Sequence, residues 1–288
     1  MPTPAAGGRV IDAHHHLWQV SRQDQPWRTH QHAAIARDFE PEHLRPELAR
    51  AGVDSTVLVQ SVDSPEENDR LAEYARQAPF VAGFVGWLPL ARPEAARAEL
   101  DRIETGALCG VRTLVARDPL GWLTEPGTVR LCHELAERGL AWDVVPVTDE
   151  QVRAVTALAG AVPELRIVID HLARPPVERG DHRAWSERLA ALAAHPAVAL
   201  KVSVGIDVLT AWEHWDRDAL LPHVAEAVRH FGPERLMLAS NWPVSLLRRD
   251  YVGTLADLTD LLARAGLGAR AVAMVRGQTA AHWYGIGA

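Results

Sequence analysis

Short apolar runs alternate with longer amphipathic stretches along the whole chain. The short runs are rich in Val, Ile and Leu, as is typical of buried parallel strands, and the stretches between them have the spacing of amphipathic helices. Strand–helix alternation of this kind predicts a parallel sheet covered by helices. The predicted strands are residues 9–14, 54–60, 80–88, 109–115, 141–145, 166–170, 197–203 and 235–240. The predicted helices are residues 65–77, 93–105, 126–137, 149–159, 185–194, 218–231 and 254–265.

Local signals support several of these helix boundaries. Ser64 and Thr148 precede acidic residues, which favour the start of a helix, and glycines follow three of the predicted helices. Eight strand–helix units in 288 residues favour an α/β fold of the closed (β/α)8 TIM-barrel type over an open doubly wound sheet. No glycine-rich phosphate loop follows a strand, which argues against nucleotide binding. We therefore expect a single domain over residues 9–288, preceded by a flexible N-terminal tail of residues 1–8.

Composition and charge exclude several classes of function. The chain is 48% hydrophobic and 23% charged, which is consistent with a large core. Its net charge of -7 offers no basic footprint for nucleic acid and no polybasic patch for a membrane surface. No apolar run reaches about 18 residues, so no transmembrane helix is expected. Cys109 and Cys132 show neither metal-ligand spacing nor a disulfide framework, and a cytoplasmic location is the expectation.

Polar side chains gather at the carboxyl ends of the predicted strands, which is where barrel enzymes carry their chemistry. Because a buried polar group without a partner is costly, such a cluster predicts a functional site. Its members are His14, His16, Gln60, Asp63, Trp87, Arg112, Thr113, Asp143, His171, Arg174, Lys201, Ser203 and Asn241.

The histidines of this set suggest a metal site. His14 and His16 are two residues apart on a strand, so their side chains are expected on the same side. With His171 they offer three nitrogen ligands to a divalent metal and leave a position for water. The alternative is a hydrogen-bonded histidine cluster that binds an anionic substrate without a metal. Asp12 has the same parity as His14 and either orients it or accepts backbone hydrogen bonds.

Cationic and aromatic residues add candidates for substrate binding. Arg112, Arg174 and Lys201 provide positive charge that can hold a carboxylate or stabilise an oxyanion. Lys201 is the only lysine among 30 basic residues, and it lies in an apolar strand. A chemical role and a structural one, in which the ammonium reaches solvent or a carboxylate, are equally consistent with that position. Tryptophans are numerous, and their flat rings suit the C–H faces of sugars, although packing explains some of them. Those expected near the site face are Trp18, Trp27, Trp87, Trp122, Trp142 and Trp242.

The motifs at the strand ends resemble, in order, those of the amidohydrolase-related family. They are Ile11-Asp12-Ala13-His14-His15-His16-Leu17-Trp18, Val57-Leu58-Val59-Gln60, Gly86-Trp87, Gly110-Val111-Arg112, Val168-Ile169-Asp170-His171-Leu172-Ala173-Arg174-Pro175, Leu200-Lys201-Val202-Ser203 and Leu236-Met237-Leu238-Ala239-Ser240-Asn241-Trp242-Pro243-Val244. The likeness covers nearly the whole chain. It is strongest to the sugar-lactone hydrolases of the L-fuconolactonase and L-rhamnonolactonase type, with the pyrone dicarboxylate lactonases nearby.

The resemblance implies a distorted TIM barrel that hydrolyses an intramolecular ester, a small lactone of a sugar acid. It implies that the three histidines form the nitrogen-rich part of the site and that Arg112 and Lys201 contact the lactone or its carboxylate. One divalent metal, zinc or manganese, and a metal-independent site both fit this branch. The residues expected to bind the substrate are Arg112, Arg174, Gln60, Trp87, Trp18 and Trp242.

Two positions depart from the family pattern. Asn241 stands where the best-studied members carry an aspartate, and Thr113 stands where a histidine is frequent. A carboxamide has no useful basicity, so Asn241 is expected to orient the attacking water rather than deprotonate it. His171 is the first candidate for the base, because an ordinary histidine pKa of about 6.5 suits that role at neutral pH. Asp143 is the next candidate, and a metal-bound hydroxide is a further route.

Two other functions stay open at the level of the sequence. One is a catalytically silent protein that binds sugar acids, which the loss of the aspartate at position 241 would explain. The other is a metal-dependent decarboxylase or hydrolase of another carboxylic acid. In each case the partner is a small molecule rather than nucleic acid or membrane, and a homo-oligomer is compatible with the sequence.

Overall fold

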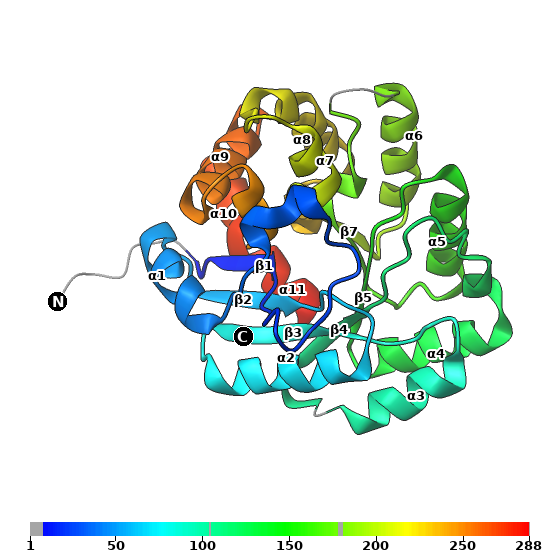
Figure 1. Cartoon of the computed structure of the whole chain (residues 1–288). Coiled ribbons are helices and arrows are strands. Elements are labelled where there is room, and N and C mark those ends of the chain that lie inside the picture. Colours follow the sequence, from blue (N-terminus) through cyan, green and yellow to red (C-terminus); the bar gives the residue numbers. More distant parts are fainter. Residues whose placement is uncertain (1–7, 104, 178–180, 288) are drawn as a thin grey trace.

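Eight parallel strands pair in chain order in the computed structural model, which describes residues 8–103, 105–177 and 181–287 (Figure 1). Every predicted strand is present, and the observed bounds differ from the predicted ones by a few residues at most. The strands are β1 (Ile11–His15), β2 (Ser55–Val59), β3 (Val81–Trp87), β4 (Leu108–Arg112), β5 (Ala141–Val144), β6 (Ile167–Ile169), β7 (Val198–Val202) and β8 (Leu236–Leu238).

The barrel closes through residues that follow β8 rather than through β8 itself. The backbone N–H of Asn241 donates to the carbonyl of His14 at 2.9 Å, and that of His16 donates to the carbonyl of Trp242 at 2.7 Å. This irregular closure confirms the expected distorted (β/α)8 barrel. It also brings the chain after the last strand against the end of the first one, so that Asn241 and His14 become neighbours.

Helices cover the outside of the barrel, and the seven predicted helices are observed with small changes at their ends (Figure 1). The side chains of Ser64 and Thr148 accept hydrogen bonds from the backbone N–H groups of Glu67 and Gln151, as their capping positions predict. These helices are α2 (Pro65–Gln77), α3 (Pro93–Arg102), α4 (Pro126–Glu137), α5 (Asp149–Ala161), α6 (His182–Ala193), α8 (Arg217–Phe231) and α9 (Tyr251–Arg264).

Four further α-helices were not predicted from the sequence. They are α1 (Pro41–Ala51), α7 (Ile206–Ala211), α10 (Ala269–Ala273) and α11 (Thr279–Tyr284). Among the described residues, none of the helices combines the length and the apolarity that a membrane span requires. The predicted tail of residues 1–8 lies, apart from Gly8, outside the described residues.

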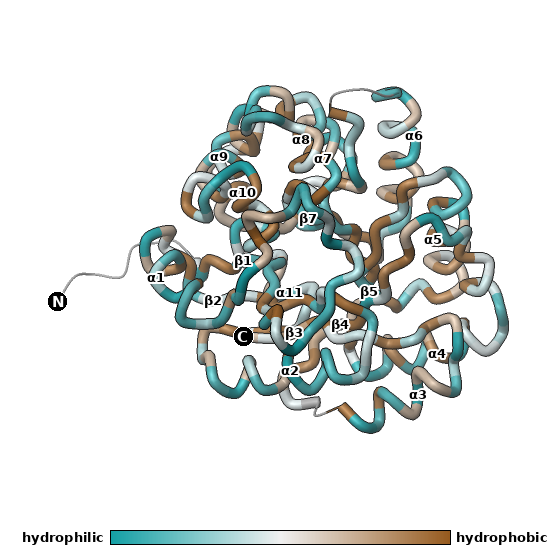
Figure 2. Tube along the Cα trace, viewed as in Figure 1, coloured by the Kyte–Doolittle hydropathy of each residue, from teal (hydrophilic) through white to brown (hydrophobic). Residues whose placement is uncertain are grey.

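The helix α11 closes the barrel at the end where the strands begin. Its residues Trp283 and Tyr284, with Ile286, pack against inward-facing strand residues such as Ile11 and Ala141. The opposite end is where the strands stop and the polar loops begin. The strands themselves are largely hydrophobic, whereas the segment between β1 and α1 that crosses this mouth is largely polar (Figure 2). The described part of the fold therefore has a polar opening at the carboxyl ends of the strands.

Candidate active site

A cavity of about 860 Å³ lies at the mouth of the barrel. Residues from the ends of several strands line it, together with residues of the segment between β1 and α1. The lining includes His16, Gln23, Trp27, Ser61, Asp63, Arg112, Leu114, His171, Arg174 and Asn241. A volume of this size is ample for a small-molecule substrate.

Two histidines at the inner end of the cavity, His16 and His171, are held in place by hydrogen bonds at their Nδ1 atoms. His16 Nδ1 lies 2.8 Å from the carbonyl oxygen of Val59, and His171 Nδ1 lies 2.8 Å from Ser203 Oγ. Because a carbonyl only accepts, His16 carries its proton on Nδ1 and keeps a lone pair on Nε2. That Nε2 atom lies 3.1 Å from Nε2 of His14. The two rings of the His-x-His pair therefore meet, as the sequence predicts.

All three rings are neutral at pH 7. Burial lowers the pKa of His14 and of His16 well below the usual histidine value, and nearby cations add to the effect. Burial also lowers the pKa of His171 to about 3. The expectation that His171 keeps an ordinary pKa is therefore wrong for the free protein. The carboxylate of Asp170 opposes the shift at both His14 and His171, so a proton arriving on either ring would be stabilised by that anion.

An unusual turn sets the position of His171. The residues from His171 to Arg174 all have positive φ angles of between 50° and 53°, and Pro175 follows them. Such left-handed backbone costs about 1–2 kcal/mol for each residue that has a Cβ atom. Asn241, which lines the same cavity as His171, also has a positive φ of 55°. Strain of this kind is typical of functional sites, where the surrounding structure holds the backbone in place.

A layer of buried charge lies beneath the histidines. Lys201 Nζ lies 2.5 Å from Asp143 Oδ2 and 3.0 Å from Asp170 Oδ1, and it also lies 3.1 Å from His14 Nδ1. Arg112 donates to the second oxygen of Asp170 at 2.8 Å. The side chains of Lys201, Asp143 and Asp170 are fully buried. Two cations and two carboxylates thus balance one another directly below the cavity.

The two carboxyl groups of this layer behave differently. Burial raises the pKa of Asp143 to about 6, although the Lys201 ammonium opposes the rise. Tyr284 of α11 donates to Asp143 Oδ2 at 2.7 Å. Burial would also raise the pKa of Asp170, but the charges of Lys201 and Arg112 and the hydrogen bond with His14 outweigh it and hold this pKa well below its usual range. Asp170 is therefore a permanent anion in the floor of the site.

Asn241 presents a free acceptor to the cavity. Its Nδ2 donates to the carbonyl of Val204 at 2.8 Å, which fixes the orientation of the carboxamide. Its Oδ1 atom is buried and has no hydrogen-bond partner among the described residues. An oxygen in this position can accept a hydrogen bond from a water molecule or from a substrate hydroxyl. The role of Asn241 in orienting water stays a prediction.

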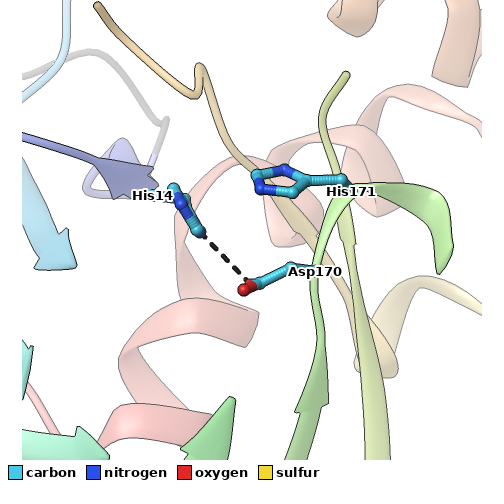
Figure 3. A group of neighbouring side chains, drawn as sticks. All are labelled: His14, Asp170 and His171. Atoms are coloured by element: carbon cyan, nitrogen blue, oxygen red, sulfur yellow. Dashed lines mark hydrogen bonds and ion pairs between the residues drawn. The ribbon is translucent and has the colours of Figure 1, made fainter. Parts of the chain in front are cut away.

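The site also has the ligand atoms of a metal centre. His14, Asp170 and His171 each offer one ligand atom, and these atoms lie within 4.8 Å of one another (Figure 3). His16 Nε2 adds a donor beside His14, so the sequence-based set of three histidines lies together, with Asp170 in addition. Nitrogen and carboxylate donors suit zinc or manganese. Metal-binding histidines are usually oriented by a hydrogen bond at the ring nitrogen that does not bind the metal. The hydrogen bonds at the Nδ1 atoms of His16 and His171 are of this kind. The residues present therefore fit one divalent ion.

Asp12 does not contact the imidazole of His14; it accepts a hydrogen bond from the backbone N–H of that residue at 3.2 Å, which is the second of the two roles that the sequence left open. A bulge in β1 between Asp12 and His15 changes the side on which the side chains lie. Asp12 faces outward, where it accepts hydrogen bonds from the backbone N–H of Ser240 at 2.8 Å and from Tyr251 of α9 at 3.1 Å. Asp12 therefore holds the closure of the barrel, and Asp170 is the carboxylate beside His14.

The remaining predicted residues fall into two groups. Arg112, Arg174, Asp63 and Thr113 line the cavity. Gln60, Trp18, Trp87 and Trp242 are buried in the packing around it and are not among its described lining residues, and the same holds for Lys201 and Asp143. The tryptophan that does line the cavity is Trp27. Sequence reasoning missed Asp170, Tyr284 and Gln23 as parts of the site, although the Asp-His pair at 170 and 171 was a usable signal for the first.

Residues 11–286 match the family described as amidohydrolase, and the chain belongs to this family. A protein of Burkholderia ambifaria named L-fucono-1,5-lactonase is 37% identical over 282 residues, which are 96% of this chain and 95% of that protein. A protein of the same name from Burkholderia multivorans is 30% identical and covers 97% of both chains. A crystal structure of an amidohydrolase from Burkholderia multivorans with bound zinc has a TM-score of 0.85 and 28% identity, over 97% of this chain and all of that one.

Proposed function

We propose that this protein is a hydrolase that opens L-fucono-1,5-lactone, or a closely related sugar-acid lactone, with water. The observation that carries the proposal is a group of four side chains at the inner end of the cavity. They are the neutral imidazoles of His16 and His171, the guanidinium of Arg112 and the carboxamide of Asn241 with its free oxygen. This group has the parts needed to orient a water molecule and to stabilise negative charge on a carbonyl oxygen. The two named lactonases that resemble the whole chain support the same reaction.

Arg112 is the group that stabilises the oxyanion. Its two terminal nitrogens donate to Asp170 Oδ2 and to the carbonyl of Gln60, both at 2.8 Å, so the guanidinium is held in one orientation. Its Nε atom is buried without a hydrogen-bond partner among the described residues. As water adds to the ring carbonyl, negative charge develops on the carbonyl oxygen. A fixed cation in a largely buried position stabilises that charge strongly because little reorganisation is needed.

Asn241 and His171 handle the water. The free oxygen of Asn241 accepts a hydrogen bond from the water molecule. This bond orients a lone pair of the water toward the carbonyl carbon of the lactone. His171 accepts the proton as the C–O bond forms, and it returns this proton to the ring oxygen as the lactone bond breaks. The positive charge on the imidazole then lies near the Asp170 carboxylate, which partly opposes the burial and the cations that lower the pKa of His171. The product is an open hydroxy acid, which releases one proton at neutral pH.

A divalent ion would be held by the imidazoles of His14, His16 and His171, with Asp170 beside them. When bound, such an ion supplies Lewis acidity for the carbonyl and acidifies a coordinated water. Lys201 and Asp143 take no direct part in this proposal. The Lys201 ammonium balances the charge of Asp170 and contacts His14 from below, and Asp143 holds that ammonium in place. The sequence-based expectations of a cytoplasmic location and of a homo-oligomer stay predictions.

The test is proton release, followed with a pH indicator in weak buffer, over a panel of sugar 1,4- and 1,5-lactones. We expect rapid hydrolysis of L-fucono-1,5-lactone compared with the buffer alone. Parallel reactions with a chelator separate a metal-dependent reaction from one carried by the side chains. If no lactone of the panel is opened, the proposal is wrong, and a silent sugar-acid-binding protein or a decarboxylase becomes the better account.

A further inference from the structure

The segment between β1 and α1 crosses the mouth of the barrel (Figure 1), and a buried polar cluster holds it there. The cluster is centred on Ser61, which follows β2. Gln23 Nε2 donates to Ser61 Oγ at 2.9 Å, and Gln25 Nε2 donates to the same oxygen at 3.4 Å. Trp27 Nε1 donates to the backbone carbonyl of Ser61 at 2.8 Å. Three side chains of an irregular segment thus share one anchoring residue, which gives the segment a defined position over the cavity.

The protons of this cluster determine how the two glutamines are oriented. Ser61 Oγ lies 3.0 Å from Glu67 Oε1, and this buried carboxylate can only accept. The single hydroxyl proton of Ser61 therefore goes to Glu67, and its lone pairs receive the N–H groups of Gln23 and Gln25. Both glutamines must present nitrogen to Ser61, so both carbonyl oxygens point elsewhere. Neither Oε1 atom has a hydrogen-bond partner among the described residues.

The two glutamines differ in one respect that matters for function. Both are nearly fully buried, with 5% of Gln23 and 2% of Gln25 exposed. Gln23 lines the cavity, whereas Gln25 is not among the described lining residues. Buried acceptors without a donor are rare in folded proteins, and each one calls for an explanation. At Gln23 a bound molecule with an O–H group would supply the missing donor.

We propose that Gln23 is a specificity residue whose Oε1 atom accepts a hydrogen bond from a ring hydroxyl of the substrate. This inference rests on the proposed function and deepens it, because it makes a polyhydroxylated lactone the preferred substrate over an unsubstituted lactone of the same ring size. Trp27 lies on the same wall, with its indole nitrogen already bonded to Ser61, so that its ring is available for the C–H face of a sugar. Discrimination of this kind is large when a buried polar group is left unpaired by the wrong substrate.

The experiment compares two six-membered lactones, L-fucono-1,5-lactone and δ-valerolactone, which has no hydroxyl groups. The quantity measured is the ratio of their kcat/KM values in the wild type, in Gln23→Leu and in Gln25→Leu. Gln25→Leu is the matched control because it removes the same kind of bond to Ser61 from a residue outside the cavity wall. We expect the ratio to fall about tenfold in Gln23→Leu, mainly through the KM of the hydroxylated lactone, and to stay unchanged in Gln25→Leu. An unchanged ratio in Gln23→Leu overturns the inference, whether the two kcat/KM values fall equally or neither falls.

A binding measurement separates this inference from the proposed function. Isothermal titration calorimetry with L-fuconate, the open acid, is run on the same three proteins. If the wild type opens neither lactone but binds the acid, and only Gln23→Leu weakens that binding, then the hydroxyl site stands and the hydrolase proposal fails. If Gln23→Leu binds the acid as tightly as Gln25→Leu does, the hydroxyl site is refuted whatever the activity. A wild type that neither opens a lactone nor binds the acid refutes both.

Discussion

Replacement of the only lysine by methionine is the most informative single perturbation of the layer below the site. Lys201 is fully buried and lies within 3.1 Å of Asp143, Asp170 and His14. Methionine has a similar length and fits an apolar strand, so Lys201→Met removes the charge with little change in volume. The change leaves two buried carboxylates with only one cation, Arg112, to balance them.

The expected loss of stability follows from these contacts. At the 3.0 Å between Lys201 Nζ and Asp170 Oδ1, the Coulomb attraction is about 5.5 kcal/mol for an effective dielectric constant of about 20. The cost of burying the ammonium offsets part of this attraction in the wild type. Removing one partner of a buried pair typically costs about 3–5 kcal/mol, because the other charge is left uncompensated. We expect a loss in this range for Lys201→Met, which is a large fraction of the roughly 5–15 kcal/mol that stabilise a typical protein.

The assay is urea unfolding followed by tryptophan fluorescence, at pH 7.5 and in the presence of a chelator. A double variant, Lys201→Met with Asp143→Asn, restores the charge balance and is expected to recover more than half of the lost free energy. The cost of the single variant should also be smaller at pH 5.5 than at pH 7.5. Burial already raises the pKa of Asp143 to about 6 in the wild type, and without Lys201 this carboxyl gains a proton more easily.

Two results would refute this reasoning. The first is a loss below about 1 kcal/mol for Lys201→Met, which would mean that the ion pairs contribute nothing net. The second is a double variant that is no more stable than the single one, since the loss would then come from packing rather than from unbalanced charge.

Four further predictions follow from the same structure. Asn241→Asp is expected to keep lactone turnover, because a carboxylate can both orient and deprotonate water; abolished turnover would contradict this. The same variant is expected to lose about 1–3 kcal/mol of stability, because the hydrogen bond to the Val204 carbonyl disappears. The metal-free wild type should bind about one equivalent of zinc in competition with a chromophoric chelator, and His14→Gln should not. Equal binding by both proteins would exclude His14 as a ligand. A hydrogen bond from Arg229 lowers the pKa of Glu226 to about 2, so this carboxylate contributes stability above pH 4.5 that is lost as the pH falls toward 2. The difference in unfolding free energy between wild type and Glu226→Gln should therefore be about 1 kcal/mol at pH 7.5, discounted for partial exposure, and should shrink at pH 3.5; a difference that is constant with pH would contradict it. An amine-reactive ester should label Lys201 only in the unfolded protein, as read by mass spectrometry of peptides, and rapid labelling of the native protein would show that the barrel floor is open to solvent.

The barrel itself was predictable from the sequence because its signals are local. Apolar runs and capping residues depend on neighbours in the chain, and all eight strands and seven helices follow from them. The end of the barrel that carries the site also followed, since polar residues at the ends of parallel strands must meet at one edge. The position of Asn241 beside the histidines is a consequence of that rule, and the irregular closure after β8 adds the direct contact.

Other parts of the site depend on tertiary structure that no local pattern reveals. The bulge in β1 reverses the parity on which the role of Asp12 was based. Tyr284 reaches Asp143 from a short helix at the other end of the chain, and Gln23 lies in an irregular segment. The positions of the tryptophans in the sequence do not tell which rings line the cavity. Among the described tryptophans, Trp27 lines it. The pKa of His171 depends on burial, which its position in the sequence does not give.

The measurement that tests the central claim most directly is the initial rate of L-fucono-1,5-lactone opening by the wild type, by His171→Gln and by His214→Gln. His171 lines the cavity, whereas His214 is exposed outside it, so the two variants make the same chemical change in different places. The account predicts rapid opening by the wild type and by His214→Gln, and a loss of at least about 100-fold in kcat for His171→Gln. Full activity of His171→Gln would show that the reaction does not use this site.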